Sequence, residues 1–370
     1  MSDLKHIIGE RLVCFECHGR VDLRNGVLVC RKCSRKYYIE HNLIVFEEPS
    51  FKAQYGQQFG EQAQDYEQIH GLDTEFSRNL ALAIKHALER VTDLPAGCAL
   101  EIGCGTGVLT RGCNYHGIAH YFLATDISRE MLAEAAKKET AGNVLYVVQD
   151  THRLNVKDAG FDIVIGTEIL HHLLDIKEGL AEVYRVLRPN GAAVFMEPFY
   201  YGYQFLVVLM NATIEHLKLQ QKYSVEHLRI LEKIVQDFEN SIQFRFKNRH
   251  SLENLAAFDD KAIFTHQDVE ILAAEVGFND VQITSPWQLN PALKAKVWKG
   301  AMIDTLEELR QAAALHDLKI DYSQIKYLDL VDDLIGHELL EHISPQGVII
   351  LSKPRHNLPR NLYRKITRYS

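Results

Sequence analysis

One short segment limits the possible folds of this chain more than any other feature. Residues 99–107 read ALEIGCGTG, an apolar run with an acid, Glu101, near its end, followed by Gly103, Gly105 and Gly107. Glycines at every second position let the backbone approach a ligand closely where the chain turns from a strand into a helix. The spacing differs from G-x-G-x-x-G, and Glu101 beside the turn suits a positively charged group better than a pyrophosphate.

Apolar runs of strand length alternate with helical stretches after this segment. Helical spacing is predicted over Ser128–Lys138 and Glu178–Leu187, among others. Strands that read as nearly continuous apolar runs are typical of a parallel sheet covered on both faces. We therefore expect an α/β protein with a doubly wound, mostly parallel, seven-stranded sheet, helical lid insertions and a small N-terminal zinc ribbon. The expected strands are residues 99–102, 121–125, 144–148, 161–166, 192–196, 281–284 and 347–351.

The composition, 46% hydrophobic and 24% charged over 370 residues, is that of a globular protein with one sizeable core and room for further modules. Residues 1–9 lack the pattern of a secretory signal, and no long apolar run is present, so we expect a cytoplasmic protein. The predicted regions are a zinc ribbon (1–48), a connector or flap (49–72), a cofactor-binding core (73–198), a helical lid insertion (199–265), the end of the core with a second helical insertion (266–352) and a basic tail (353–370).

Four of the seven cysteines form two C-x-x-C pairs, Cys14 with Cys17 and Cys30 with Cys33. Two intervening residues let both thiolates of a pair face one ion, and two such pairs complete a tetrahedral site. We predict a structural Zn²⁺ without a catalytic role, because four thiolates leave no open position. The surrounding arginines and lysines leave open a contact with an acidic partner or RNA, beside the plain reading of a solvated surface.

Acidic residues follow three successive expected strands. Besides Glu101, Asp126 stands where a carboxylate accepts hydrogen bonds from ribose hydroxyls in doubly wound folds. Asp150 follows the third strand and can reach the exocyclic amine of an adenine, while Thr151 continues the turn. The predicted ligand is therefore of adenosine type with a positive charge.

The segments Glu101–Gly107, Thr125–Ser128 and Leu187–Gly191, with Phe161-Asp162, resemble the successive motifs of class I S-adenosylmethionine-dependent methyltransferases with a methyltransferase type 11-like core. The resemblance covers roughly residues 75 to 200, and Asn190, where Gly is common, is a small departure. It implies that the glycine loop and Glu101 hold the methionine part of S-adenosyl-L-methionine, Asp126 the ribose, and Ile127 with Asp150 the adenine. Thr167 completes the predicted cofactor set.

The N-terminal module resembles the zinc ribbons found on some members of that family, including a ribosomal RNA guanine methyltransferase and several methyltransferases of secondary metabolism. Because those relatives have different substrates, the resemblance points to the cofactor rather than to the acceptor.

The turn after the fourth expected strand, GTEILHHL over residues 166–173, carries the ionisable candidates for the acceptor side. We predict His171 as a general base, with Glu168 as its neighbour, because a histidine near its ordinary pKa can take a proton as the methyl group transfers. The alternative is that the histidines here cap or pack, since methyl transfer can proceed by positioning alone.

Three function hypotheses follow. The first is methylation of a small metabolite with an apolar or aromatic pocket, at oxygen or alternatively at carbon or nitrogen. The second is an RNA base methyltransferase that uses the ribbon to contact RNA, against which the net charge of −8 counts. The third is a non-enzymatic cofactor-binding partner module. The basic tail suggests an acidic partner or anionic surface, the ribbon suggests a homodimer contact, and an S-adenosylmethionine reaction other than methyl transfer stays open.

Overall fold

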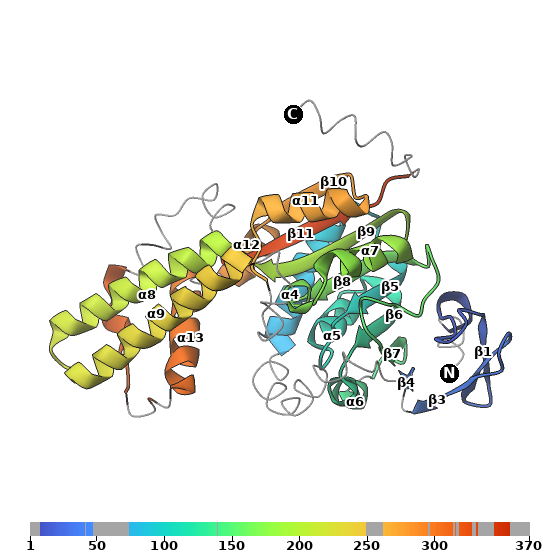
Figure 1. The fold of residues 1–370 in the computed structure, drawn as a ribbon, viewed down its shortest axis with the longest axis horizontal. Coiled ribbons are helices and arrows are strands. Elements are labelled where there is room, and N and C mark those ends of the chain that lie inside the picture. Colours follow the sequence, from blue (N-terminus) through green and yellow to red (C-terminus); the bar gives the residue numbers. More distant parts are fainter. Residues whose placement is uncertain are drawn as a thin grey trace. The chain divides into compact units, whose positions relative to one another are not determined.

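The structure is a computed structural model, and it describes residues 8–40, 42–46, 74–138, 140–248, 262–294, 297–313, 315, 318–327, 331 and 344–355. The expected connector and all but the first residues of the expected basic tail lie outside this set. The chain divides into two compact units, which we call the sheet unit (1–195, 270–282 and 349–370) and the helical unit (196–269 and 283–348) (Figure 1). The region boundaries predicted above stay predictions.

A parallel array of strands forms the centre of the sheet unit. Its strands β5 (Ala96–Ile102), β6 (Ala119–Asp126), β7 (Val144–Val148) and β8 (Phe161–Thr167) pair in the order β7-β6-β5-β8. Beyond these parallel strands the sheet continues, in this order, through β9 (Leu187–Pro198), β11 (Gln346–Ser352) and β10 (Asp280–Thr284). Every residue of β7 is buried, as expected for a strand covered on both faces.

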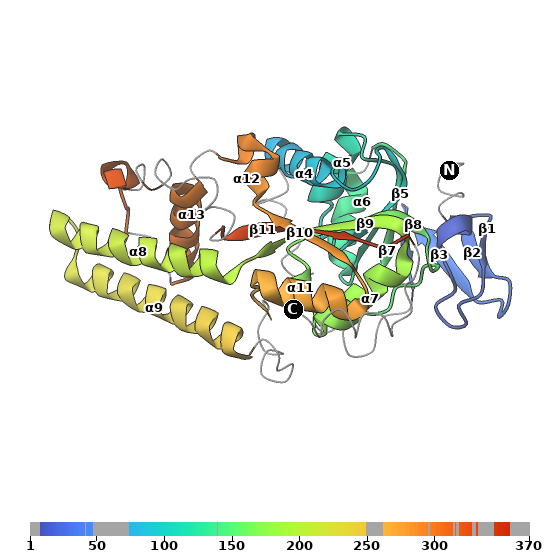
Figure 2. The ribbon, with the colours of Figure 1, turned by 90° about the horizontal axis from the view of Figure 1, so that it is seen from above.

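Helices cover the strands on both faces. Figure 2 shows α4 (Thr74–Leu88), α5 (Val108–Tyr115) and α6 (Arg129–Lys138) on one side, with α7 (Ile176–Val186) and α11 (His266–Val276) on the other. Helices α4 and α5 approach closely because Gly112 has no side chain: a Cβ there would lie 2.2 Å from the carbonyl oxygen of Ser77. The Asp175 carboxylate caps α7 by accepting from the backbone N–H of Glu178. The doubly wound α/β prediction agrees with this arrangement.

The N-terminal module is built from four short strands. These are β1 (Val21–Arg24), β2 (Val27–Cys30), β3 (Lys36–Glu40) and β4 (Leu43–Val45), which pair antiparallel in chain order. Strand β4 then pairs in parallel with β7, opposing Leu43 with Tyr146 and Val45 with Val148. Over the described residues the sheet consequently has eleven strands, and the predicted count of seven is not confirmed, because the module joins the sheet edge instead of standing apart.

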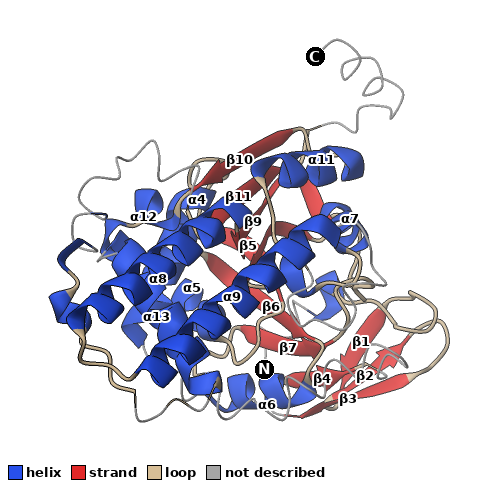
Figure 3. Ribbon diagram, turned by 60° about the vertical axis from the view of Figure 1, so that its left-hand side comes forward, coloured by secondary structure: helices blue, strands red, loops and turns tan. Residues whose placement is uncertain are grey.

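The helical unit contains α8 (Tyr200–Gln220), α9 (Val225–Asn248), the short α12 (Pro286–Leu289) and α13 (Val297–Ala312). Helices α8 and α9 run side by side (Figures 1 and 3), and their shared core includes Leu206, Met210 and Leu231. Helices α8 and α9 lie within the stretch predicted as a helical lid insertion, of which residues 249–261 lie outside the described residues. Among the helices of the described part, none is long and apolar enough to cross a membrane.

Lys353, the first residue of the predicted basic tail, is held by the carboxyl end of α7. Its ammonium group donates to the carbonyl oxygens of Tyr184 (2.6 Å) and Leu187 (2.7 Å), at the carboxyl end of α7, and the side chain is buried. Burial lowers the pKa of Lys353. This lysine is therefore a core residue that satisfies helix-terminal carbonyls.

Candidate cofactor site and metal cluster

The glycine loop between β5 and α5 has left-handed backbone conformation at all three predicted glycines, with φ of 62°, 52° and 79° at Gly103, Gly105 and Gly107. A Cβ on Gly103 would lie 2.3 Å from Ile169, so this glycine serves close packing. A Cβ on Gly105 would meet no atom of the described part of the chain within 4 Å, so the loop borders open space there among these residues. Within the described residues, the buried hydroxyl of the neighbouring Thr106 has no hydrogen-bond partner.

Asp126, at the end of β6, is held facing this loop. Its Oδ2 accepts from the backbone N–H of Gly105 and its Oδ1 from that of Ser128, each at 2.8 Å. Burial raises the pKa of Asp126, while these backbone N–H groups oppose the rise. Ile127 is half-buried beside it. The carboxylate is thus fixed at the carboxyl ends of β5 and β6, where ligands bind in doubly wound folds.

Glu101 lies buried at the end of β5, only 2% exposed. The Thr110 hydroxyl donates to its Oε2 at 2.5 Å. Burial raises the pKa of Glu101 to about 8, so the carboxyl group is mostly protonated at pH 7 when no cation is present. A positive charge placed beside it would restore the ionised form, which fits the predicted cationic ligand.

The turn after β7 shows a contact that the sequence analysis missed. Asp150 Oδ1 accepts from both the backbone N–H of His152 (2.9 Å) and its ring Nδ1 (2.6 Å). The ring Nε2 accepts from the backbone N–H of Asp175 at 3.1 Å, which makes Nδ1 the protonated nitrogen of a neutral imidazole. Thr151 is buried next to this pair. Nothing in the strand pattern distinguishes His152 from an ordinary loop residue.

The N-terminal module borders this turn on two sides. On one side, β4 pairs with β7. On the other side, the backbone N–H of Val13 donates to the carbonyl oxygen of Asn155 (3.0 Å), and the backbone N–H of Lys157 donates to the carbonyl oxygen of Arg11 (2.8 Å). The segment that carries Asp150 is therefore enclosed between β7 and contacts with residues 11–13.

The turn after β8 lies beside the glycine loop through the contact of Ile169 with Gly103. Thr167 ends β8, and Glu168 follows with a φ of 53°. The Nε2 atom of His171 lies 3.7 Å from Glu168 Oε2, and the His171 side chain is 3% exposed. The turn that holds Thr167 and Glu168 thus lies beside the predicted cofactor site, and His171 is buried within 4 Å of Glu168.

The four predicted metal ligands come together. The sulfur atoms of Cys14, Cys17, Cys30 and Cys33 lie within 4.8 Å of one another, with Cys14–Cys33 at 3.6 Å and Cys17–Cys30 at 3.5 Å. These separations suit tetrahedral coordination, because Zn–S bonds of about 2.3 Å place sulfurs about 3.8 Å apart. Although burial alone raises the pKa of Cys30, backbone N–H groups of Cys33 and Lys32 donate to its sulfur, and its pKa falls to about 6. The donor set therefore fits a thiolate-bound zinc ion.

Comparisons with known proteins agree with this geometry. Residues 100–195 match the family described as methyltransferase domain. The chain is 31% identical over 137 residues to a malonyl-[acyl-carrier protein] O-methyltransferase of Hamiltonella defensa subsp. Acyrthosiphon pisum, covering 37% of this chain and 49% of the relative. It is 30% identical over 108 residues to human mitochondrial arginine-hydroxylase NDUFAF5, covering 29% of this chain and 30% of that relative.

Among solved structures, phosphoethanolamine N-methyltransferase 2 of Haemonchus contortus in complex with S-adenosyl-L-methionine matches with a TM-score of 0.45 at 18% identity, covering 80% of this chain and 57% of that one. The chain spans about half the length, or less, of these curated relatives. The resemblance predicted for roughly residues 75 to 200 is confirmed over residues 100–195: the chain contains a methyltransferase domain of the class I type.

Proposed function

We propose that this chain, which carries a class I methyltransferase domain in residues 100–195, is an S-adenosylmethionine-dependent methyltransferase acting on a small metabolite. The observation that carries the proposal is the open space at Gly105, which faces the fixed carboxylate of Asp126. Buried Glu101 lies near the end of β5, the strand that leads into the glycine loop. A left-handed glycine without neighbours lets ligand atoms lie against the backbone, and the two acids suit ribose hydroxyls and a cationic amino acid end.

Bound S-adenosyl-L-methionine would supply an electrophilic methyl group on a sulfonium ion. Asp126 would accept hydrogen bonds from the ribose hydroxyls, and Ile127 with Thr151 would border the adenine. Asp150 would reach the adenine with the oxygen that does not accept from His152, so we add His152 as the residue that orients this carboxylate. Glu101, Gly103, Gly107 and Thr167 would line the methionine end.

For the acceptor we propose attack by oxygen, with carbon and nitrogen as alternatives. The named reaction of the Hamiltonella relative is an O-methylation, while the human relative is named for a hydroxylation, so the shared core serves more than one reaction type. RNA base methylation and a non-enzymatic partner module remain the competing functions. The net charge of −8 counts against the first, and the complete set of glycines and acids counts against the second.

His171 stays our proposed base, acting on the acceptor side with Glu168 next to it at 3.7 Å. Its burial raises a definite alternative, in which the ring packs against His172, 4.1 Å away between ring centroids, and catalysis needs no base. Turnover by His171→Ala decides between them: a loss of about 10²-fold or more supports the base, whereas activity within a few-fold of wild type removes the assignment.

We further propose that the cysteine cluster binds a structural Zn²⁺ and so supports the segment carrying Asp150. The support is the set of backbone contacts from residues 11–13 and from β4, on either side of that segment. Metal analysis of the purified chain tests the first part.

Calorimetric titration with S-adenosylmethionine and S-adenosylhomocysteine, with Asp126→Ala as control, tests the cofactor. Radiolabel transfer to a metabolite extract and to total RNA, run in parallel, tests the acceptor class. Absence of cofactor binding by the wild-type chain refutes the proposal. Label in small molecules supports it, and label in RNA selects the competing function.

A further inference from the structure

Gln149, the first residue after β7, carries a buried amide that the proposed cofactor site does not use. The residue is only 4% exposed. Burying an amide is unfavourable unless its polar atoms are hydrogen-bonded. Within the described residues its Nε2 atom has no hydrogen-bond partner, whereas its Oε1 atom accepts from the backbone N–H of Asn155 at 2.9 Å. The bond accepted by Oε1 is therefore what this amide supplies.

The backbone of Gln149 holds the ribose end of the proposed cofactor site. Its N–H group donates to the carbonyl oxygen of Asp126 at 2.9 Å. The Asp126 carboxylate in turn accepts from the backbone N–H of Gly105 at 2.8 Å. Gln149 thus contacts Asn155 through its side chain and, through its backbone, the acid that faces the glycine loop.

Asn155 belongs to the segment on which the N-terminal module docks. Leu12 and Val156 form an antiparallel bridge, and the backbone N–H of Val13 donates to the carbonyl oxygen of Asn155 at 3.0 Å. Val13 directly precedes Cys14, the first of the four predicted metal ligands. A restraint on Cys14 therefore also restrains Val13, which is bonded to Asn155.

These contacts join into one hydrogen-bond path from Val13 to Asp126. Its links are, in order, Val13 to Asn155 (3.0 Å), Asn155 to Gln149 (2.9 Å) and Gln149 to Asp126 (2.9 Å). All have the length of ordinary N–H···O bonds, and bonds in a buried series strengthen one another. Backbone groups make every link except one, in which the acceptor is Gln149 Oε1. A substitution of Gln149 can therefore break the path without changing the backbone.

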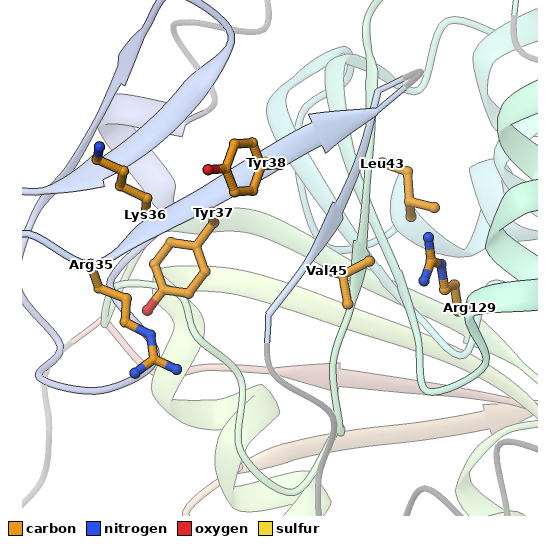
Figure 4. Close-up of a pocket in the computed structure, with 7 residues that line it drawn as sticks. All are labelled: Arg35, Lys36, Tyr37, Tyr38, Leu43, Val45 and Arg129. Atoms are coloured by element: carbon orange, nitrogen blue, oxygen red, sulfur yellow. The ribbon is translucent and has the colours of Figure 1, made fainter.

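The packing of the module is less complete on the side of β3 and β4. Residues of these two strands and Arg129, the first residue of α6, line a pocket of about 260 Å³ (Figure 4). A cavity removes contacts that would transmit a small displacement from one element to the next. Besides the hydrogen-bond path, the pairing of β4 with β7 remains as a second connection, which an experiment has to separate from the first.

We propose that Gln149 is a positioning residue that couples metal binding in the N-terminal module to cofactor binding at Asp126. With zinc bound, Cys14 restrains Val13, and the hydrogen-bond path holds Asp126 in the orientation that accepts the ribose hydroxyls. Such coupling is reciprocal: a bound cofactor tightens zinc binding by the same factor by which zinc tightens cofactor binding. The coupling rests on the proposed function, because it acts on the cofactor site proposed above.

The test measures the zinc affinity of the full chain by competition with a chromophoric chelator, with and without saturating S-adenosylhomocysteine. The ratio of the two zinc dissociation constants is the coupling factor. The variants Gln149→Met and Gln149→Leu keep a side chain of similar size without the acceptor oxygen. The matched control is Asn155→Ala, which keeps the backbone groups of the path; within the described residues Asn155 Oδ1 has no hydrogen-bond partner.

We expect S-adenosylhomocysteine to tighten zinc binding by the wild-type chain about fivefold or more. Calorimetric titration of the zinc-loaded and zinc-free chain with S-adenosylhomocysteine should give the same factor. Both Gln149 variants should bind zinc without cofactor much as the wild type does, which shows that they fold, yet lower the coupling factor to about one. Asn155→Ala should keep the wild-type factor.

The outcomes separate the coupling from the function on which it rests. If the zinc-loaded wild-type chain binds S-adenosylhomocysteine but the coupling factor is one, the coupling is refuted and the proposed function stands. An unchanged factor in the Gln149 variants also overturns the proposal, in favour of the pairing of β4 with β7. Absence of S-adenosylhomocysteine binding refutes both.

Discussion

Replacing Gly105 by alanine separates a cost to folding from a cost to cofactor binding. The residue has a φ of 52°, and a Cβ there would meet no atom of the described residues within 4 Å. Gly117 offers a matched control, with a φ of 62° and equally open surroundings. It lies just before β6, whereas Asp126 ends that strand, so the two glycines lie at opposite ends of the parallel strands.

Both alanine variants are expected to lose a similar amount of stability. A left-handed conformation costs an alanine about 1–2 kcal/mol, partly offset by about 0.4–1 kcal/mol from the stiffer unfolded chain. The net loss of about 1 kcal/mol corresponds to a fall in Tm of roughly 2–4 °C for a unit of this size. Differential scanning calorimetry measures it.

Cofactor affinity should distinguish the two variants. The added methyl group at Gly105 occupies space that the proposed ligand uses, so we expect its Kd for S-adenosylhomocysteine to rise about tenfold or more, equivalent to about 1.4 kcal/mol. Gly117→Ala should bind as the wild type does. If Gly105→Ala binds equally well, the open space beside the loop is not the cofactor site, and the argument from this glycine fails.

Four further predictions concern the charged groups and the support of the site. Because burial raises the pKa of Glu101 to about 8, the folded chain without cofactor holds a proton that the unfolded chain releases near pH 4.5; its stability should fall between pH 4.5 and 8, and Glu101→Gln should remove that slope. Cofactor binding at pH 7 should likewise release protons, which calorimetry in buffers of different ionisation enthalpy detects. Cys30→Ser should abolish zinc binding and weaken S-adenosylhomocysteine binding together, whereas weakened zinc with unchanged cofactor affinity would show that the module does not support the Asp150 segment. Lys353→Met should lower stability by about 1–3 kcal/mol in chemical unfolding, since two buried carbonyl groups lose their donor.

The local features of the fold could be predicted from the sequence. The expected strand at 144–148 coincides with β7, and the expected helix at 128–138 matches α6 to within one residue. The glycine loop and Asp126 also meet as expected, because a parallel sheet brings the carboxyl ends of adjacent strands to one edge. Such predictions depend on short-range patterns, which a single chain segment carries within itself.

Two features could not be predicted in this way. His152 orients Asp150 through a hydrogen bond to the backbone of Asp175, a contact between loops that no periodicity signals. Strand β4 is three residues long, and its pairing with β7 joins segments about a hundred residues apart in the chain. A sequence as short as Leu-Ile-Val is compatible with many surroundings, so its partner is decided by the whole sheet unit.

The pairing of β4 with β7 changes how the N-terminal module should be understood. A separate ribbon would influence the cofactor site only by chance, whereas here the cysteine cluster, β3 and β4 lead in one continuous sheet to the strand that precedes Asp150. Tyr37 links the cysteine cluster to the end of β4. Its hydroxyl lies 3.1 Å from Cys14 Sγ, and its ring packs edge-on against Phe46, the residue after β4. A change at the metal cluster therefore has a short structural route to the adenine end of the proposed site. This is why zinc content and cofactor affinity should be measured on the same preparations.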